Sequence, residues 1–157
     1  MVEATTSVDR FLNGYGCSQA ILTHFCEQFD MDQLTALKIS SAFPAGMQMA
    51  GICGAVTGAY MVLGLKFAHQ ESSESAGRKR VYEAVAEFTQ RFRECHNTLD
   101  CKELLGCNIM TAEGKATADQ ENLFKTVCPT FVEDATRILQ EMMASPGKPD
   151  KTLEVKS

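Results

Sequence analysis

Apolar residues recur three and four positions apart along most of this chain, which is the spacing of one face of an α-helix. This pattern predicts helices over residues 4–13, 17–29, 32–43, 53–68, 72–96, 100–105 and 118–144. The last region is interrupted at Cys128-Pro129, where the residue before proline is expected to be the N-cap of a new helix. No segment alternates apolar and polar residues as a half-buried strand does. The sequence therefore predicts an all-α fold.

Three segments break the helical pattern. Residues 44–52 are rich in proline and glycine, residues 111–117 are polar, and the chain after residue 144 is polar again. We expect loops at the first two and a disordered tail over residues 145–157. Residues 1–144 are then expected to form a single compact domain of several helices, since one core suits a chain of 157 residues.

The predicted helix over residues 53–68 contains three glycines, Gly54, Gly58 and Gly64. Glycine inside a helix costs about 1 kcal/mol relative to alanine. The glycines therefore predict that a large neighbour, either another helix or a bound centre, comes close to this backbone.

Charge and hydropathy exclude two classes of protein. The net charge is −5, and the only dense basic cluster, Arg78 to Arg80, is surrounded by glutamates, so we expect no nucleic-acid partner. The longest apolar stretch covers about fifteen residues (54–68), whereas a membrane-spanning helix needs about twenty. Acidic Glu3 and Asp9 interrupt the region where an export signal needs an apolar run. We therefore expect a cytoplasmic protein without a membrane span.

The chain has seven cysteines, and a reducing cytoplasm changes how they are interpreted. In that compartment, metal ligation, redox chemistry or simple burial is more typical than a structural disulfide. Four of them, Cys17, Cys53, Cys101 and Cys128, stand where predicted helices begin. The first turn of a helix offers free backbone N–H groups and a partial positive charge, which favour the thiolate that binds metal or attacks a disulfide. These four are the candidate site residues, and burial as structural thiols is the simpler alternative.

The other three cysteines have different positions. Cys26 and Cys95 lie on the apolar stripes of their helices and are expected to be buried as small hydrophobic residues. Cys107 follows Gly106 and does not begin a helix, so it is a buried thiol, an alternate ligand or a resolving thiol. No C-x-x-C motif is present, and a thioredoxin-type dithiol is therefore not indicated. No ligand role is predicted for the three histidines, His24, His69 and His96.

Several blocks of the sequence resemble the C-GCAxxG-C-C family, whose members are described as redox-active and metal-binding. The blocks are Gly14–Ala20, Gly51–Ala59, Met61–Lys66, Cys101–Gly106 and Cys128–Val132. The resemblance covers residues 8–144 and implies that the four helix-start cysteines together hold a metal or an iron–sulfur cluster. The family is also similar to the non-haem part of split-Soret cytochromes, where cysteines are thought to hold an iron–sulfur centre.

The chain departs from the family pattern at two places. The usual Gly-Gly-Gly-Met before the second block is Pro44-Ala45-Gly46-Met47 here, and the usual asparagine before the first cysteine is Gly16. A stiffer loop near Cys53 is expected as a result.

Three hypotheses follow for the function. The first is a redox-active metal-binding protein with an iron–sulfur cluster on Cys17, Cys53, Cys101 and Cys128, used for electron transfer or redox sensing with an unidentified redox partner protein. The second is a metal-free thiol–disulfide oxidoreductase, and the third is a non-catalytic module with a structural Cys₄ zinc site. No further catalytic residue is predicted. The sequence leaves open both an enzymatic activity and a homodimer with the centre at its interface.

Overall fold

The structure, a computed structural model, describes residues 6–68 and 74–145. In chain order its elements are α1 (Ser7–Leu12), α2 (Cys17–Phe25), η1 (Cys26–Phe29), α3 (Gln33–Ile39), η2 (Gly46–Ala50), α4 (Gly54–Phe67), α5 (Glu74–His96), α6 (Cys101–Leu105), α7 (Ala112–Gln120), α8 (Leu123–Thr126) and α9 (Cys128–Ala144). Within these ranges the only β-type pairing is an isolated bridge between Ile52 and Asp100. The predicted all-α fold is confirmed.

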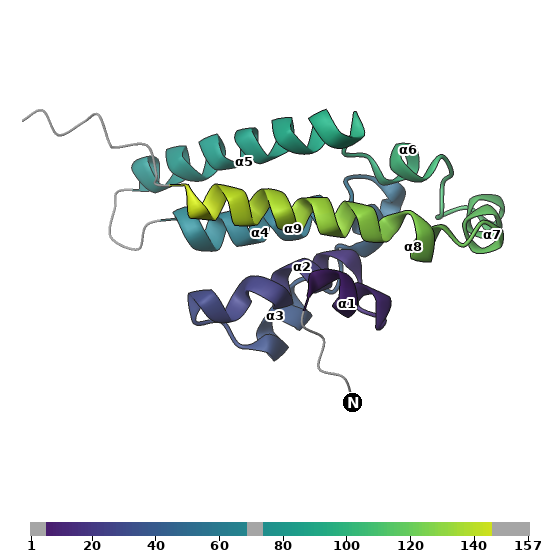
Figure 1. The fold of residues 1–157 in the computed structure, drawn as a ribbon, viewed down its shortest axis with the longest axis horizontal. Coiled ribbons are helices and arrows are strands. Elements are labelled where there is room, and N and C mark those ends of the chain that lie inside the picture. The colour runs from purple at the N-terminus through teal and green to yellow at the C-terminus, as the bar shows by residue number, and fades with distance from the viewer. Residues whose placement is uncertain (1–5, 69–73, 146–157) are drawn as a thin grey trace, which may run out of the picture.

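Three long helices, α4, α5 and α9, lie side by side along the longest axis of the molecule (Figure 1). Helix α2 packs against both α4 and α9, and α1 and α3 flank α2. The short helices α6, α7 and α8 gather at the end of the molecule where α9 begins (Figure 1). The long helices and α2 share one core, whose fully buried side chains include Ile21, Val62, Phe88, Phe92 and Leu139.

The glycines of α4 allow α2 to approach its backbone. A Cβ atom on Gly58 would lie 2.9 Å from the carbonyl oxygen of Ser18, and one on Gly54 would lie 2.2 Å from Cys17 Sγ. Nothing lies within 4 Å of the corresponding position at Gly64. The predicted close approach is therefore confirmed at Gly54 and Gly58, where α2 is the neighbour, and it is wrong for Gly64.

Helix α3 differs from its prediction in both length and buried face. It ends at Ile39, earlier than predicted, and the Leu34 and Ile39 side chains are 59% and 51% exposed. Two small residues, Ala36 and Ser40, are fully buried instead. The Ser18 hydroxyl of α2 donates a hydrogen bond to the Ser40 carbonyl at 2.8 Å, and this close contact favours small side chains on the inner face.

The expected loop over residues 111–117 is wrong, because helix α7 begins there. The Thr111 side chain caps it by accepting a hydrogen bond from the Gly114 N–H at 3.0 Å. The only buried residues of α7 are Gly114 and Ala118, which are too small to form a recognisable apolar stripe. A Cβ on Gly114 would lie 1.8 Å from the Asn108 carbonyl oxygen, so glycine lets the helix rest on the preceding turn.

The remaining sequence expectations concern the loop, the tail and the membrane. Residues 44–52 are irregular apart from the single wide turn η2, as expected. Of the expected tail, the structure describes only Ser145, which is the C-cap of α9. His69 also lies outside the described residues. No helix in the described part of the chain is long and apolar enough to cross a membrane.

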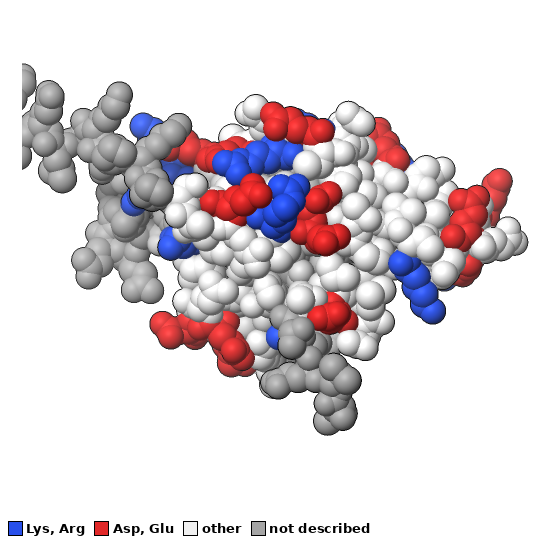
Figure 2. Space-filling view, viewed as in Figure 1, with Lys and Arg blue, Asp and Glu red and all other residues white. Residues whose placement is uncertain are grey.

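The charged side chains of α5 and α9 form a mixed network. Figure 2 shows acidic and basic groups interleaved over these two helices. Arg91 of α5 lies 2.6 Å from Glu87 and 3.4 Å from Glu141 of α9, and Arg137 lies 3.2 Å from Glu141. These contacts tie the outer faces of the two helices together.

Candidate functional site

Four helix starts carry cysteines, as predicted. Cys17, Cys101 and Cys128 are the first residues of α2, α6 and α9, and Cys53 is the N-cap of α4. One detail differs, because Cys128 was expected at the N-cap of its helix and Val127 holds that position. All four sulfur atoms therefore come from the first turn of a helix or from the residue just before it.

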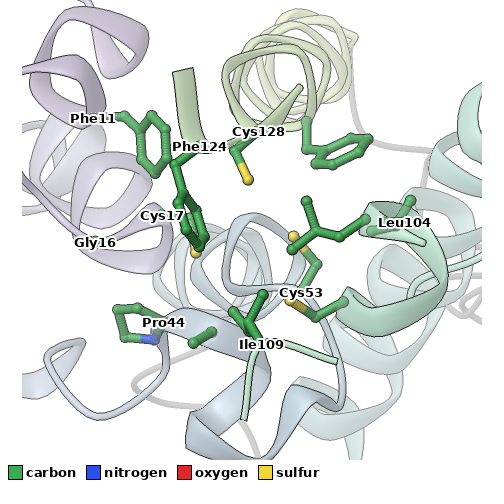
Figure 3. Close-up of a pocket in the computed structure, with 13 residues that line it drawn as sticks. Phe11, Gly16, Cys17, Pro44, Cys53, Leu104, Ile109, Phe124 and Cys128 are labelled. Atoms are coloured by element: carbon green, nitrogen blue, oxygen red, sulfur yellow. The ribbon is translucent and has the colours of Figure 1, made fainter. Parts of the chain in front are cut away.

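The four helix starts meet around one cavity (Figure 3). Cys17, Cys53, Cys101 and Cys128 all line it, and its volume is about 210 Å³. The rest of the lining comes from Gly16, Phe11, Pro44, Ala45, Leu104, Leu105, Ile109, Phe124 and Phe131. The described lining contains no Lys, Arg, His, Asp or Glu side chain. The structure thus brings all four candidate residues together in a weakly polar enclosure.

A short backbone clip joins the second and third cysteine blocks. The Cys53 N–H donates a hydrogen bond to the Leu99 carbonyl at 2.8 Å, and the Cys101 N–H donates to the Gly51 carbonyl at 2.6 Å. This is the isolated bridge centred on Ile52 and Asp100. Because these bonds join main-chain atoms, they fix the distance between the backbones of Cys53 and Cys101.

The first and second cysteines form a hydrogen-bonded thiol pair. The Cys53 thiol donates to Cys17 Sγ, and this bond lowers the pKa of Cys17 to about 7 against the opposing effect of burial. The N–H groups of Ala45 and Ser18 also donate to Cys17 and lower its pKa further. The same pairing raises the pKa of Cys53 well above its ordinary value. Cys17 is therefore the more acidic thiol of the pair and is partly ionised at neutral pH.

A left-handed turn places one of the N–H groups that face Cys17. The backbone φ angle is positive at four consecutive residues, with values of 59° at Ala45, 62° at Gly46, 58° at Met47 and 58° at Gln48. Left-handed backbone costs roughly 1–2 kcal/mol at each residue that carries a Cβ. The Met47 N–H donates to the Phe43 carbonyl at 2.9 Å, which helps to hold the turn. The strained turn directs the Ala45 amide toward the Cys17 sulfur.

The third and fourth cysteines hold their protons more firmly. Burial raises the pKa of Cys101 to about 11 and that of Cys128 to about 12, and the negative charge on Cys17 adds to both shifts. A bound cation would remove this cost, because it displaces the protons and neutralises the thiolates. The site therefore has one thiol, Cys17, that ionises near neutral pH. The other three thiols stay protonated there unless a cation binds.

The metal-free protein should react with iodoacetamide at Cys17 with a midpoint near pH 7. The thiolate is the reactive form, so the rate of alkylation rises as the pH passes through the pKa of Cys17. This pKa is about 7, whereas the ordinary value is 9.0. Mass spectrometry of the alkylated peptides across a pH series measures the midpoint. Cys53→Ala removes the thiol donor and should move the midpoint upward, whereas Cys95→Ala should leave it unchanged. A Cys17 midpoint near pH 9 in the unmodified protein would contradict this account.

The remaining cysteines lie outside the cavity lining. Cys26 is fully buried, as expected, and its thiol donates to the Thr23 carbonyl at 3.5 Å. Cys95 was expected to be buried but is exposed, and Arg137 Nη2 lies 3.6 Å from its sulfur. The Cys95 side chain thus lies at the surface, next to the charged residues of α5 and α9. Cys107 is partly exposed, and its charge contributes to the raised pKa of Cys101 and Cys128, so its role as an alternate ligand stays a prediction.

Sequence reasoning identified the four cysteines that line the cavity but not its other walls. Leu104 and Leu105 follow Cys101 by three and four positions, and Phe131 follows Cys128 by three. This helical spacing is the signal that could have assigned them. Phe11 and Phe124 lie on other elements, α1 and α8, and only the tertiary packing brings them to the cavity.

The fold and the cavity define a helical thiol protein whose four helix-start cysteines share one site. A family model with the description "Putative redox-active protein (C_GCAxxG_C_C)" matches residues 15–142, and the chain belongs to this family. The resemblance found in the sequence blocks is thereby confirmed. No curated protein and no solved structure matches the chain.

Proposed function

We propose that this protein holds an iron–sulfur cluster on Cys17, Cys53, Cys101 and Cys128 and uses it for electron transfer or redox sensing. The observation that supports this most directly is the arrangement of all four cysteines around one cavity. Four thiolates meet the ligand demand of a cluster. The proposal sets the protein in the reducing cytoplasm, with a redox partner protein to exchange electrons.

The size of the cavity favours a centre of several atoms. A cavity needs only about 10–15 Å³ to hold one water molecule, and the whole cavity that the cysteines help to line has a volume of about 210 Å³. A zinc ion bound at about 2.3 Å would require sulfur atoms roughly 3.8 Å apart. Within the described residues, no group of three or more His, Cys, Asp or Glu side chains is close enough together to hold a single metal ion. The volume of the cavity is therefore the observation that favours a cluster of several atoms over a single zinc ion.

The walls and the backbone also suit such a centre. Soft thiolates are the only metal-binding side chains among the residues that line the cavity. When bound, the cluster would supply one-electron chemistry. The amide N–H groups of Ala45 and Ser18 face the Cys17 sulfur, and such hydrogen bonds to a ligand sulfur raise the reduction potential of a cluster. Cys53 and Cys101 are buried among the apolar walls, whereas Cys17 and Cys128 are partly exposed.

Anaerobically purified protein should be brown and should contain stoichiometric iron and sulfide. Serine at any one of the four cavity cysteines should reduce both to a small fraction of the wild-type content, because a ligand is lost. Cys95→Ser is the matched control, since Cys95 is exposed and outside the cavity, and it should retain the full content. Elemental analysis and the visible spectrum measure the result. Protein that stays colourless and free of iron after anaerobic reconstitution contradicts the proposal.

A second candidate function rests on the Cys17–Cys53 pair. The Cys17 thiolate could attack a disulfide of a partner, forming a mixed disulfide and releasing one partner thiol. Cys53 would then lose its proton and attack Cys17 Sγ, leaving a Cys17–Cys53 disulfide and a second reduced partner thiol. Differential alkylation of iron-free protein, equilibrated with glutathione buffers, tests this reaction. A reproducible Cys17–Cys53 pair supports it, and seven unpaired thiols under every condition exclude it.

A further inference from the structure

A histidine–carboxylate pair lies behind the wall of the cysteine cavity. His96 ends α5, its side chain is only 11% exposed, and its Nε2 lies 2.8 Å from Asp134 Oδ2 of α9. The carboxylate is close but lies off the N–H direction, so Nε2 makes no aligned hydrogen bond. A protonated ring would still gain from the nearby negative charge, because charge–charge attraction does not need this alignment.

Aromatic rings link this pair to the cavity. The His96 ring packs against Phe92, with centroids 4.7 Å apart, and edge-on against Phe131 at 5.0 Å. Phe131 also lines the cysteine cavity and stands one helical turn after Cys128. The Phe131 ring therefore touches both the histidine and the space where the centre would sit. Charges on the two sides of this ring interact through apolar material, where screening by water is weak.

The charged groups near His96 lie on its own helix, α5, and on α9. Arg137 Nη2 lies 3.2 Å from Asp134 Oδ1, so the carboxylate is shared between the arginine and the histidine. The other charged or titratable groups of this cluster lie farther out on α5 and α9 and are Glu87, Arg91, Cys95 and Glu141. Asp134 is thus the acidic group in direct contact with the imidazole.

We propose that His96, supported by Asp134, takes up a proton when the centre in the cysteine cavity takes up an electron. This inference rests on the proposed cluster. One electron from a one-electron donor adds one negative charge to a cavity whose described lining holds no basic side chain to offset it. One proton then leaves hydronium or a buffer acid and binds the unprotonated ring nitrogen of His96, so an N–H bond forms as the donor's bond to that proton breaks. Histidine suits this task because its charge changes between about pH 5 and pH 8.

Potentiometric titration of the reconstituted protein with dithionite as the reductant tests the coupling. The midpoint potential of the wild-type centre should fall with rising pH, by up to about 59 mV per unit, which is the value for one proton per electron. His96→Gln should make the midpoint potential independent of pH over the same range. Asp134→Asn should shift the pH range over which the midpoint potential changes. His24→Gln is the matched control on α2, outside the cavity lining, and should retain the wild-type slope.

A second readout does not depend on any variant. The pH at which the His96 ring resonances titrate in wild-type NMR spectra should move upward on reduction of the centre, whereas those of His24 should not. This inference is overturned if His96 titrates at the same pH in both oxidation states, or if the potential of His96→Gln keeps its pH slope. In either case the iron and sulfide content would still support the cluster. Protein without any cluster overturns both proposals, and elemental analysis separates the two cases.

Discussion

Replacing Gly54 by alanine should abolish assembly of the centre while leaving the helices in place. The new Cβ would lie 2.2 Å from Cys17 Sγ, which no real contact allows, so the sulfur must leave its position. Cys17 would then lose the hydrogen bond from Cys53 and its place at the cavity wall. Iron and sulfide content should fall to a small fraction of the wild-type value, and in metal-free protein the alkylation midpoint of Cys17 should rise toward pH 9.

Gly64→Ala is the matched control for this change. It stands in the same helix, α4, and nothing lies within 4 Å of its Cβ position. Alanine also favours the helix by about 1 kcal/mol over glycine, so this variant should bind the centre normally and unfold at a slightly higher temperature. Circular dichroism confirms that both variants keep their helices. Normal iron content in Gly54→Ala would show that Cys17 does not hold the centre from its position against α4.

Replacing Phe92 by alanine should lower the free energy of unfolding by about 3–5 kcal/mol. The Phe92 side chain is fully buried and stacks on Phe88 with a centroid distance of 6.0 Å. Its removal leaves a cavity between α5 and the helices that it covers. This loss is a large share of the roughly 5–15 kcal/mol that holds a domain of this size folded.

Urea denaturation followed by circular dichroism measures the change, with the slope of the transition compared between variants. Tyr82→Ala lies on the same helix, and its side chain is 64% exposed, so it should change the free energy by less than about 0.5 kcal/mol. A Phe92→Ala variant as stable as Tyr82→Ala would mean that α5 does not cover the core as described.

The sequence was most informative where local chemistry decides the structure. Glycines and caps mark helix starts through backbone geometry alone, and the four cavity cysteines could be separated from Cys26 on that basis. Periodicity failed where small residues make the contact, as at Ala36 in α3 and Gly114 in α7, because they leave no apolar stripe. It also failed for Cys95, which the pattern placed on the buried face of α5 and which packing leaves exposed.

Other features of the site depend on contacts that no local pattern encodes. The pairing of Cys53 with Cys17 and the backbone clip between Gly51 and Cys101 join segments far apart in the chain. His96 is a similar case, since its environment comes from Asp134 and Phe131 on another helix. A single sequence shows the residue types involved but not which of them meet.

The order of the cavity cysteines along the chain has a consequence for how the protein matures. The cysteines extend from residue 17 to residue 128, and the last of them begins α9, the helix that packs on α1, α2, α4 and α5. During synthesis the N-terminal helices leave the ribosome first, and contacts between distant segments must wait for the chain that closes them. The cavity can therefore close only after α9 has been synthesised. A centre of the kind proposed could bind all four cysteines only after that helix has joined the others.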